Sequence, residues 1–198
     1  MLRVSFSVIV SVGCDLVLTP SGGNSWATAK RLCEGVQSAF YDAVDEKRKV
    51  MGSETTDLSP RLAAIVDALP LRPGLRVLEI GCGPGAAARA VARRVGNGHV
   101  LAIDRSAKAV EQARRGAEAE IAAGLLIVRQ AAAENLELED GEALYDIAFA
   151  VRVGALDGRH PEAGKQALRR IAAALTPGGR LFIDGGDPLR EVPLGVVR

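Results

Sequence analysis

The chain contains RVLEIGCGPG at residues 76–85, a stretch that passes from a strand through a glycine turn toward a helix. Val77, Leu78 and Ile80 make a short apolar run, typical of a parallel strand that is buried on both faces. Three glycines follow at two-residue spacing, where a sharply turning backbone that approaches a ligand has no room for side chains. The Ala-rich segment 86–95 then predicts a helix whose free N–H groups face the turn.

Glu79 distinguishes between two classes of nucleotide ligand for this turn. The segment GCGPGA also satisfies the loose dinucleotide pattern G-x-G-x-x-G/A, so the glycines alone select neither class. A carboxylate at the end of the strand would repel a diphosphate by roughly 4 kcal/mol at ~4 Å and an effective dielectric of ~20. The same carboxylate would attract an ammonium group. We therefore expect a nucleoside that carries an amino acid, as S-adenosylmethionine does.

The pattern E-x-G-x-G-x-G, formed by Glu79, Gly81, Gly83 and Gly85, resembles the first motif of class I S-adenosylmethionine-dependent methyltransferases. The resemblance extends over about residues 60–184. It implies methyl transfer with S-adenosyl-L-methionine as the cofactor. It also implies an α/β fold, a doubly wound and mostly parallel Rossmann-like sheet with helices on both faces.

A second acidic residue, Asp104, ends the predicted strand 99–103, about 20 residues beyond the glycine turn. At this spacing a parallel neighbouring strand brings a carboxylate to a ribose, where it can accept from both hydroxyl groups. The other interpretation is an Asp that merely precedes the helix capped by Ser106. Arg105 follows directly and is included among the predicted cofactor contacts.

The segment AAAENL, residues 131–136, resembles the third motif of the family but departs from it at one position. Ala132 stands where the family commonly has Asp to accept from the adenine amino group. The backbone around Ala133 and the side chain of Glu134 are the remaining candidates for the adenine edge. Glu134 has an equally good interpretation as a cap of the following turn.

The resemblance also places the end of the predicted strand 145–150 beside the transferable methyl group. Together, these segments give a set of predicted cofactor-binding residues: Glu79, Gly81, Cys82, Gly83, Gly85, Asp104, Arg105, Ala132, Ala133, Glu134, Ala150 and Val151. Cys82 is interpreted as a small filler between glycines rather than as a nucleophile.

No catalytic residue is assigned, and three residues are candidates. Arg152 follows the strand 145–150, where it would either pair with a carboxylate of substrate or cofactor or lie on the surface. His160 would serve as a general base, although its place before Pro161, where a helix begins, favours a loop role. Tyr41 lies on a predicted amphipathic helix and would line the site or face the core.

The sequence predicts three parts: an N-terminal extension 1–23, a helical cap 24–70 and the cofactor-binding α/β domain 71–198. Apolar residues alternate with serines over residues 4–12, which favours a hairpin strand. A disordered extension and a targeting segment are the alternatives for this part.

Few residues follow the last predicted parallel strand, 180–184, which comes after a turn formed by TPGG at the end of a predicted helix 162–175. We therefore expect the C-terminal strand pair of the family to be shortened or missing. That would leave strand 180–184 as an exposed edge, which proteins cover or use for dimerisation. We expect either a homodimer through this edge or pairing with a hairpin from residues 3–18.

Length and composition limit the classes of function. A chain of 198 residues predicts one domain, too short for separate cofactor and substrate domains. The 25 basic and 24 acidic residues give a net charge of +1, and aromatic residues make up 4%, so neither nucleic acid nor a membrane is expected as a partner. A small-molecule acceptor is favoured. Three widely spaced cysteines indicate a reduced, cytoplasmic protein without a metal site.

Two other functions stay open at this point. The first is a module that binds the cofactor but is inactive or depends on a partner, and Ala132 supports it. The second is a nicotinamide-dependent oxidoreductase, which would use the same strand, turn and helix. This class often carries a Tyr-x-x-x-Lys pair, whereas Tyr41 and Tyr145 are followed four residues later by Asp45 and Phe149.

Overall fold

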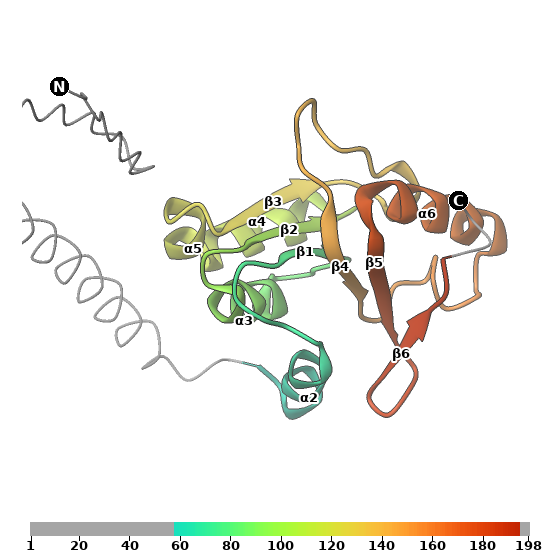
Figure 1. Cartoon of the computed structure of the whole chain (residues 1–198), viewed down its shortest axis with the longest axis horizontal. Helices are drawn as coiled ribbons and strands as arrows, with labels where there is room; N and C mark the ends of the chain where they lie inside the picture. Colours follow the sequence, from blue (N-terminus) through green and yellow to red (C-terminus); the bar gives the residue numbers. More distant parts are fainter. Residues whose placement is uncertain (1–57, 195–198) are drawn as a thin grey trace, which may run out of the picture. The chain divides into compact units, whose positions relative to one another are not determined.

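Figure 1 shows the computed structural model, which describes residues 58–194. The predicted hairpin in residues 1–23, Tyr41 and all of the predicted helical cap before residue 58 lie outside the described residues. The α/β domain predicted from residue 71 is described almost to its end.

A six-stranded sheet forms the centre of the described chain, in the order β3, β2, β1, β4, β5, β6. Its strands are β1 Arg76–Ile80, β2 His99–Asp104, β3 Leu126–Gln130, β4 Tyr145–Ala150, β5 Leu175–Asp184 and β6 Leu189–Val192. The first five run parallel and β6 is antiparallel. In chain order, the strands begin with β1 in the middle of the sheet, move outward through β2 to β3, and return to β4 on the other side of β1. Ligands of such sheets bind where the order reverses, which here is the C-terminal end of β1 and β4.

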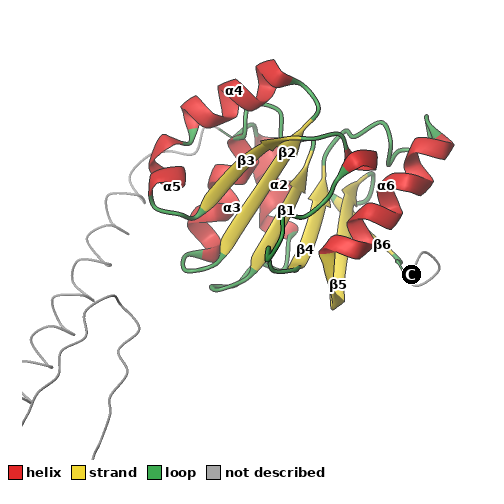
Figure 2. Cartoon of the chain, turned by 90° about the horizontal axis from the view of Figure 1, so that it is seen from above, coloured by secondary structure: helices red, strands yellow, loops and turns green. Residues whose placement is uncertain are grey.

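Helices cover both faces of this sheet, so the predicted doubly wound fold is confirmed. The helices are α2 Pro60–Ala68, α3 Ala86–Val95, α4 Ala107–Gly116, α5 Glu118–Ala122 and α6 Pro161–Ala174, with a short 3-10 turn η1 at Ala133–Asn135. One buried apolar cluster joins α2, α3 and α4 to the sheet, and a second cluster joins η1 and α6 to the opposite face. Figure 2 shows α2 and α3 on the other side of the strands from α6.

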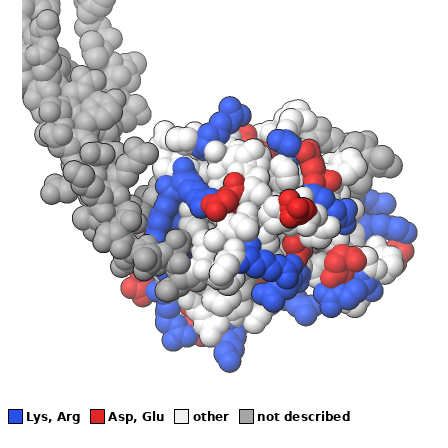
Figure 3. All heavy atoms as spheres, turned by 90° about the horizontal axis from the view of Figure 1, so that it is seen from below, with Lys and Arg blue, Asp and Glu red and all other residues white. Residues whose placement is uncertain are grey.

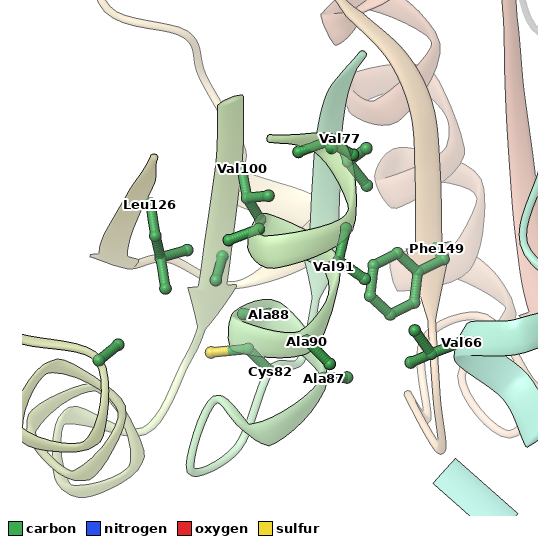
Figure 4. Packing of buried hydrophobic residues seen from close by; sticks show 14 of the residues in the cluster. Val66, Val77, Cys82, Ala87, Ala88, Ala90, Val91, Val100, Leu126 and Phe149 are labelled. Carbon is green, nitrogen blue, oxygen red and sulfur yellow. The ribbon is translucent and has the colours of Figure 1, made fainter. Parts of the chain in front are cut away.

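Small side chains let α3 lie close against the sheet. Almost every Ala and Val of this helix is buried, so its backbone approaches β1 and β2 closely. Figure 4 shows Val91 of α3 between Val77 and Phe149, with Val66 of α2 beside the Phe149 ring. Helix α3 begins directly after the glycine turn, with Gly85 as its N-cap.

Strand β6 corrects the expectation that β5 would be an exposed edge. It pairs antiparallel with β5 from Leu181 opposite Val192 to Asp184 opposite Leu189. A hairpin return of this kind needs few residues, which is why the short C-terminal segment suffices. Because β6 occupies this side of β5, neither a second copy nor residues 3–18 can pair there as we expected. The end strands of the described sheet are β3 and β6.

The segment TPGG also differs from the expected turn. Helix α6 ends at Ala174, and strand β5 begins at once with Leu175. The pairing with β4 shifts from Tyr145 opposite Leu175 to Ile147 opposite Arg180, so the residues between them bulge out of the ladder. These Pro and Gly residues therefore lie in a bulge inside β5 rather than in the expected turn between the helix and the strand.

None of the helices in residues 58–194 has the length and apolar character that crossing a membrane requires.

Candidate functional site

The glycine turn lies between β1 and α3, at the end of the sheet where β1 meets β4. Gly81, Gly83 and Gly85 have φ values of +72°, +54° and +79°, a region that residues with a Cβ rarely adopt. The N–H groups of Gly81 and Cys82 donate to the carbonyl oxygen of Ile103 at 2.8 and 2.9 Å. These bonds tie the turn to the end of β2.

The surroundings of the three glycines show which of them faces a ligand. A Cβ on Gly81 would lie 2.6 Å from Cγ2 of Val153, and a Cβ on Gly85 would lie 2.9 Å from Cβ of Ala113. A Cβ on Gly83 would meet nothing within 4 Å. Gly81 and Gly85 therefore permit close packing within the protein, whereas the backbone at Gly83 borders open space.

Glu79 is buried at the end of β1, with 4% of its surface exposed. Its carboxylate accepts a hydrogen bond from the N–H of Ala88, in the first turn of α3, which lowers its pKa. Burial outweighs this bond and, with a smaller contribution from the charge of Asp104, raises the pKa of Glu79 to about 8. Its Oε2 atom is buried without a hydrogen-bond partner. A buried acceptor of this kind is costly unless a ligand donates to it.

Asp104 connects the glycine turn to the start of α4. Its Oδ2 accepts from the N–H of Gly83 at 2.9 Å, and its Oδ1 accepts from the N–H of Ser106 at 2.8 Å. Each carboxylate oxygen has two lone pairs, so both retain capacity for a ribose hydroxyl. Ser106 also caps α4, because its hydroxyl accepts from the N–H of Ala109 at 3.3 Å. The two interpretations of Asp104 therefore describe compatible contacts.

The segment predicted to border the adenine lies beside Asp104. The N–H of Ala131 donates to the Asp104 carbonyl oxygen at 3.0 Å, and η1 begins two residues later. Ala133 is buried, while Ala132 and Glu134 are partly exposed. The structure thus brings this segment next to the predicted ribose contact, and its role toward adenine stays a prediction.

The end of β4 meets the glycine turn from the other side. Ala150 is buried and pairs with Ile80 of β1, the residue before Gly81. Val151 is partly buried and packs against the apolar cluster that joins α2, α3 and α4 to the sheet. Arg152 has a left-handed backbone, with φ +55°, and Val153 packs on Gly81. The predicted neighbours of the transferable methyl group therefore lie beside the turn.

The other predicted residues lie in varied surroundings. His160 is exposed at the N-cap of α6, where its side chain makes no capping bond. Arg105 is exposed, and its carbonyl oxygen accepts from the side chain of Gln130 at 3.2 Å. Cys82 is buried next to α3 (Figure 4), and burial raises the pKa of its thiol, as expected of a filler rather than a nucleophile.

Sequence reasoning missed Asp184 and Val153 as parts of this region. Asp184 ends β5, and its Oδ1 accepts from the N–H of Arg152 at 3.0 Å. The rule that singled out Asp104, a carboxylate at the C-terminal end of a parallel strand, applies equally to Asp184. No local sequence pattern predicts the contact between Val153 and Gly81.

Known proteins resemble the chain over this same region. The family model described as a methyltransferase domain matches residues 77–179. A protein-L-isoaspartate O-methyltransferase from Methylorubrum populi is 36% identical over 152 residues, covering 75% of this chain and 63% of that protein. The 27-O-demethylrifamycin SV methyltransferase of Amycolatopsis mediterranei is 34% identical over 168 residues, covering 77% of this chain and 57% of that protein.

Solved structures extend the likeness to the fold. A S-adenosylmethionine-dependent methyltransferase from Thiobacillus denitrificans, solved with S-adenosyl-L-homocysteine, is 28% identical with a TM-score of 0.50. The match covers 66% of this chain and 50% of that one, so the chain spans less than two thirds of each of these relatives. The family model nevertheless matches more than half of the chain, including the glycine turn and Asp104. The chain belongs to the class I S-adenosylmethionine-dependent methyltransferases.

Proposed function

We propose that this chain binds S-adenosyl-L-methionine at the glycine turn and transfers its methyl group to a small-molecule acceptor. The observation that carries the proposal is Oε2 of Glu79, a buried acceptor without a partner beside a turn whose Gly83 borders open space. The ammonium of the methionyl group would supply the missing donor. Asp104 would bind the ribose, and residues 131–134 would border the adenine.

The cofactor brings its own activated methyl group on a sulfonium, so the protein has mainly to bind, orient and exclude water. Buried Ala150 and partly buried Val151 make the end of β4 apolar, which suits the exclusion of water from the reacting atoms. The Arg152 side chain, which is exposed beside them, would pair with a carboxylate of the acceptor. The proposed site thus combines polar contacts for the cofactor with an apolar reaction side.

The charge distribution supports a small-molecule acceptor over nucleic acid. Basic and acidic residues are almost equal in number, and on the face shown in Figure 3 they lie interspersed with uncharged surface. The names of the relatives describe two kinds of acceptor, a small molecule for the rifamycin enzyme and a protein for the isoaspartate enzyme. We infer that this chain acts on a small molecule, as the rifamycin enzyme does. We also infer that it acts in the cytoplasm.

A transfer screen tests the acceptor. The protein is incubated with methyl-labelled cofactor and either a metabolite panel or an isoaspartyl peptide, and label in the products is counted. We expect label on at least one small molecule and none on the peptide. Label on the peptide alone would contradict the assignment.

A binding module that is inactive or needs a partner is the second candidate. Ala132 favours it, because this position lacks the carboxylate with which the family commonly holds adenine. The side chains of Ala150 and Val151 at the reaction side also carry no acid or base. S-adenosylhomocysteine binding together with no labelled product from any acceptor would favour this candidate over the enzyme.

Replacing Asp104 with Ala is expected to weaken S-adenosylhomocysteine binding roughly tenfold to thirtyfold, because a charged acceptor for the ribose is lost. Calorimetry measures the affinity, with Asp140→Ala on an exposed loop as the control of equal charge change. 5′-Methylthioadenosine, which keeps the ribose but lacks the amino acid, should lose affinity by a similar factor. Undiminished binding of either ligand would refute the ribose contact.

A further inference from the structure

Asp184 makes two contacts at the C-terminal end of β5. Its Oδ1 accepts from the N–H of Arg152, and its Oδ2 accepts from Nη2 of Arg61, each at 3.0 Å. The first contact is possible because Ala150 and Ile183 are paired on neighbouring parallel strands, so the residues that follow them lie side by side. The carboxylate therefore joins the loop after β4 to β5 and to α2.

The backbone of Arg152 is unusual. With φ +55°, it is the one residue other than Gly that has a positive φ between residues 58 and 194. A side chain makes this conformation unfavourable, and residues that adopt it persist only where their surroundings hold them. A charge-assisted hydrogen bond to the N–H of the same residue is such a support. The bond from Asp184 is thus a contact that can hold Arg152 in this conformation.

The residue after Arg152 packs directly on the glycine turn. Cγ2 of Val153 lies so close to Gly81 that a Cβ there would be 2.6 Å from it. A rotation about the backbone of Arg152 would move Val153, because it displaces every following atom of the loop. The place of Val153 over the turn depends on the conformation that Asp184 supports.

We propose that Asp184 is a positioning residue that holds Arg152 in the left-handed conformation, so that Val153 closes one side of the cofactor site at Gly81. The inference rests on the proposed function, because it takes the glycine turn as that site. Asp184 acts through the loop rather than by touching the cofactor. Its ion pair with Arg61 contributes little, since 66% of the Arg61 side chain is exposed.

A double-mutant cycle separates this role from a general loss of stability. S-adenosylhomocysteine affinity is measured by calorimetry for the wild type, Asp184→Ala, Arg152→Gly and the double variant. Asp184→Ala should weaken binding about tenfold in the wild-type background. The same change should weaken binding less than about twofold when residue 152 is Gly, because Gly adopts a positive φ without support. Because the loss from Asp184→Ala is measured within each background, any effect on affinity of removing the Arg152 side chain cancels.

Three further results bear on the proposal. Arg61→Ala should bind S-adenosylhomocysteine as the wild type does, and Asp184→Asn, which keeps an acceptor oxygen for the Arg152 N–H, should stay within about threefold of it. An equal loss from Asp184→Ala in both backgrounds, or no loss in either, would overturn the proposal. If Asp184→Ala alone fails to fold, the double variant should fold, and failure of both would also count against it.

Hydrogen exchange of the ligand-free protein tests the loop without reference to the cofactor. In Asp184→Ala, the amides of residues 152–156 should exchange at least tenfold faster than in the wild type, with residues 99–104 of β2 unchanged as an internal control. Unchanged exchange in the loop would refute the role of Asp184 while leaving the proposed function intact. Faster exchange in a protein whose wild type binds no S-adenosylhomocysteine would refute the proposed function instead.

Discussion

Replacing Glu79 with Gln is expected to weaken S-adenosylhomocysteine binding on the order of 100-fold. The proposed partner of Glu79 is the methionyl ammonium, and a neutral amide cannot compensate that charge in a site where Glu79 is 4% exposed. At about pH 8 the same change should raise the melting temperature of the ligand-free protein, because burying an amide costs less than burying a carboxylate. Calorimetry and thermal unfolding measure the two effects.

Two comparisons make this prediction specific. 5′-Methylthioadenosine has no ammonium group, so Glu79→Gln should leave its affinity within about twofold of the wild type. Glu120 is the matched control, since it is equally buried at 2% exposure but forms an ion pair with Arg93 at 2.9 Å. Glu120→Gln should lower the melting temperature and leave S-adenosylhomocysteine binding unchanged. Equal losses for both ligands in Glu79→Gln would refute the ammonium contact.

A site that is preformed for a charged ligand group binds that group tightly but destabilises the ligand-free protein. The carboxylate of Glu79 is placed before any ligand arrives, held by the N–H of Ala88 on one side and left without a partner at Oε2. A surface carboxylate in its place would be hydrated and would contribute little to affinity. The buried position weakens the ligand-free fold and strengthens the contact with a cation.

The parts of the fold and site that the sequence predicts are those encoded locally. Apolar runs specify β1 to β4, and the glycine pattern locates the turn, because each depends on neighbouring residues alone. The place of Asp104 at the end of β2, beside the glycine turn, was predictable as well, since parallel strands bring their C-terminal ends to one edge of the sheet. The orientation of Glu79 toward α3 could not be predicted, because strand alternation does not say which face of β1 the helix covers.

Contacts that no local sequence pattern encodes were not predictable. Four residues of β6 do not stand out as a strand by their pattern, so their pairing with β5 escaped notice and the edge was misjudged. The bond from Arg152 to Asp184 joins the loop after β4 to the end of β5, and it depends on a backbone conformation that no residue preference indicates for Arg. Both follow from tertiary packing rather than local propensity.

The stability of the ligand-free protein is expected to fall as the pH rises from about 5 to about 8. In the unfolded chain Glu79 has the ordinary pKa of a Glu carboxyl, 4.5, whereas burial in the fold raises its pKa to about 8. Between these values the folded state binds one proton that the unfolded state has released, so rising pH favours unfolding by up to about tenfold per pH unit. His99 has an opposite effect below its ordinary pKa of 6.5, because burial lowers the pKa of His99 in the fold and the unfolded chain then binds the extra proton.

Subtracting the pH profile of Glu79→Gln from that of the wild type isolates the Glu79 contribution, since His99 is the same in both. The difference in unfolding free energy should change steadily between about pH 5 and 8 and level off above. S-adenosylhomocysteine affinity should rise over the same range in the wild type only, because the ammonium binds the ionised form of Glu79. Below its pKa, Glu79 must therefore release a proton when the ligand binds. Calorimetry in buffers of different ionisation enthalpy counts that proton. Parallel stability profiles, or no proton released near pH 7, would show that Glu79 is already ionised and partnered before the ligand arrives.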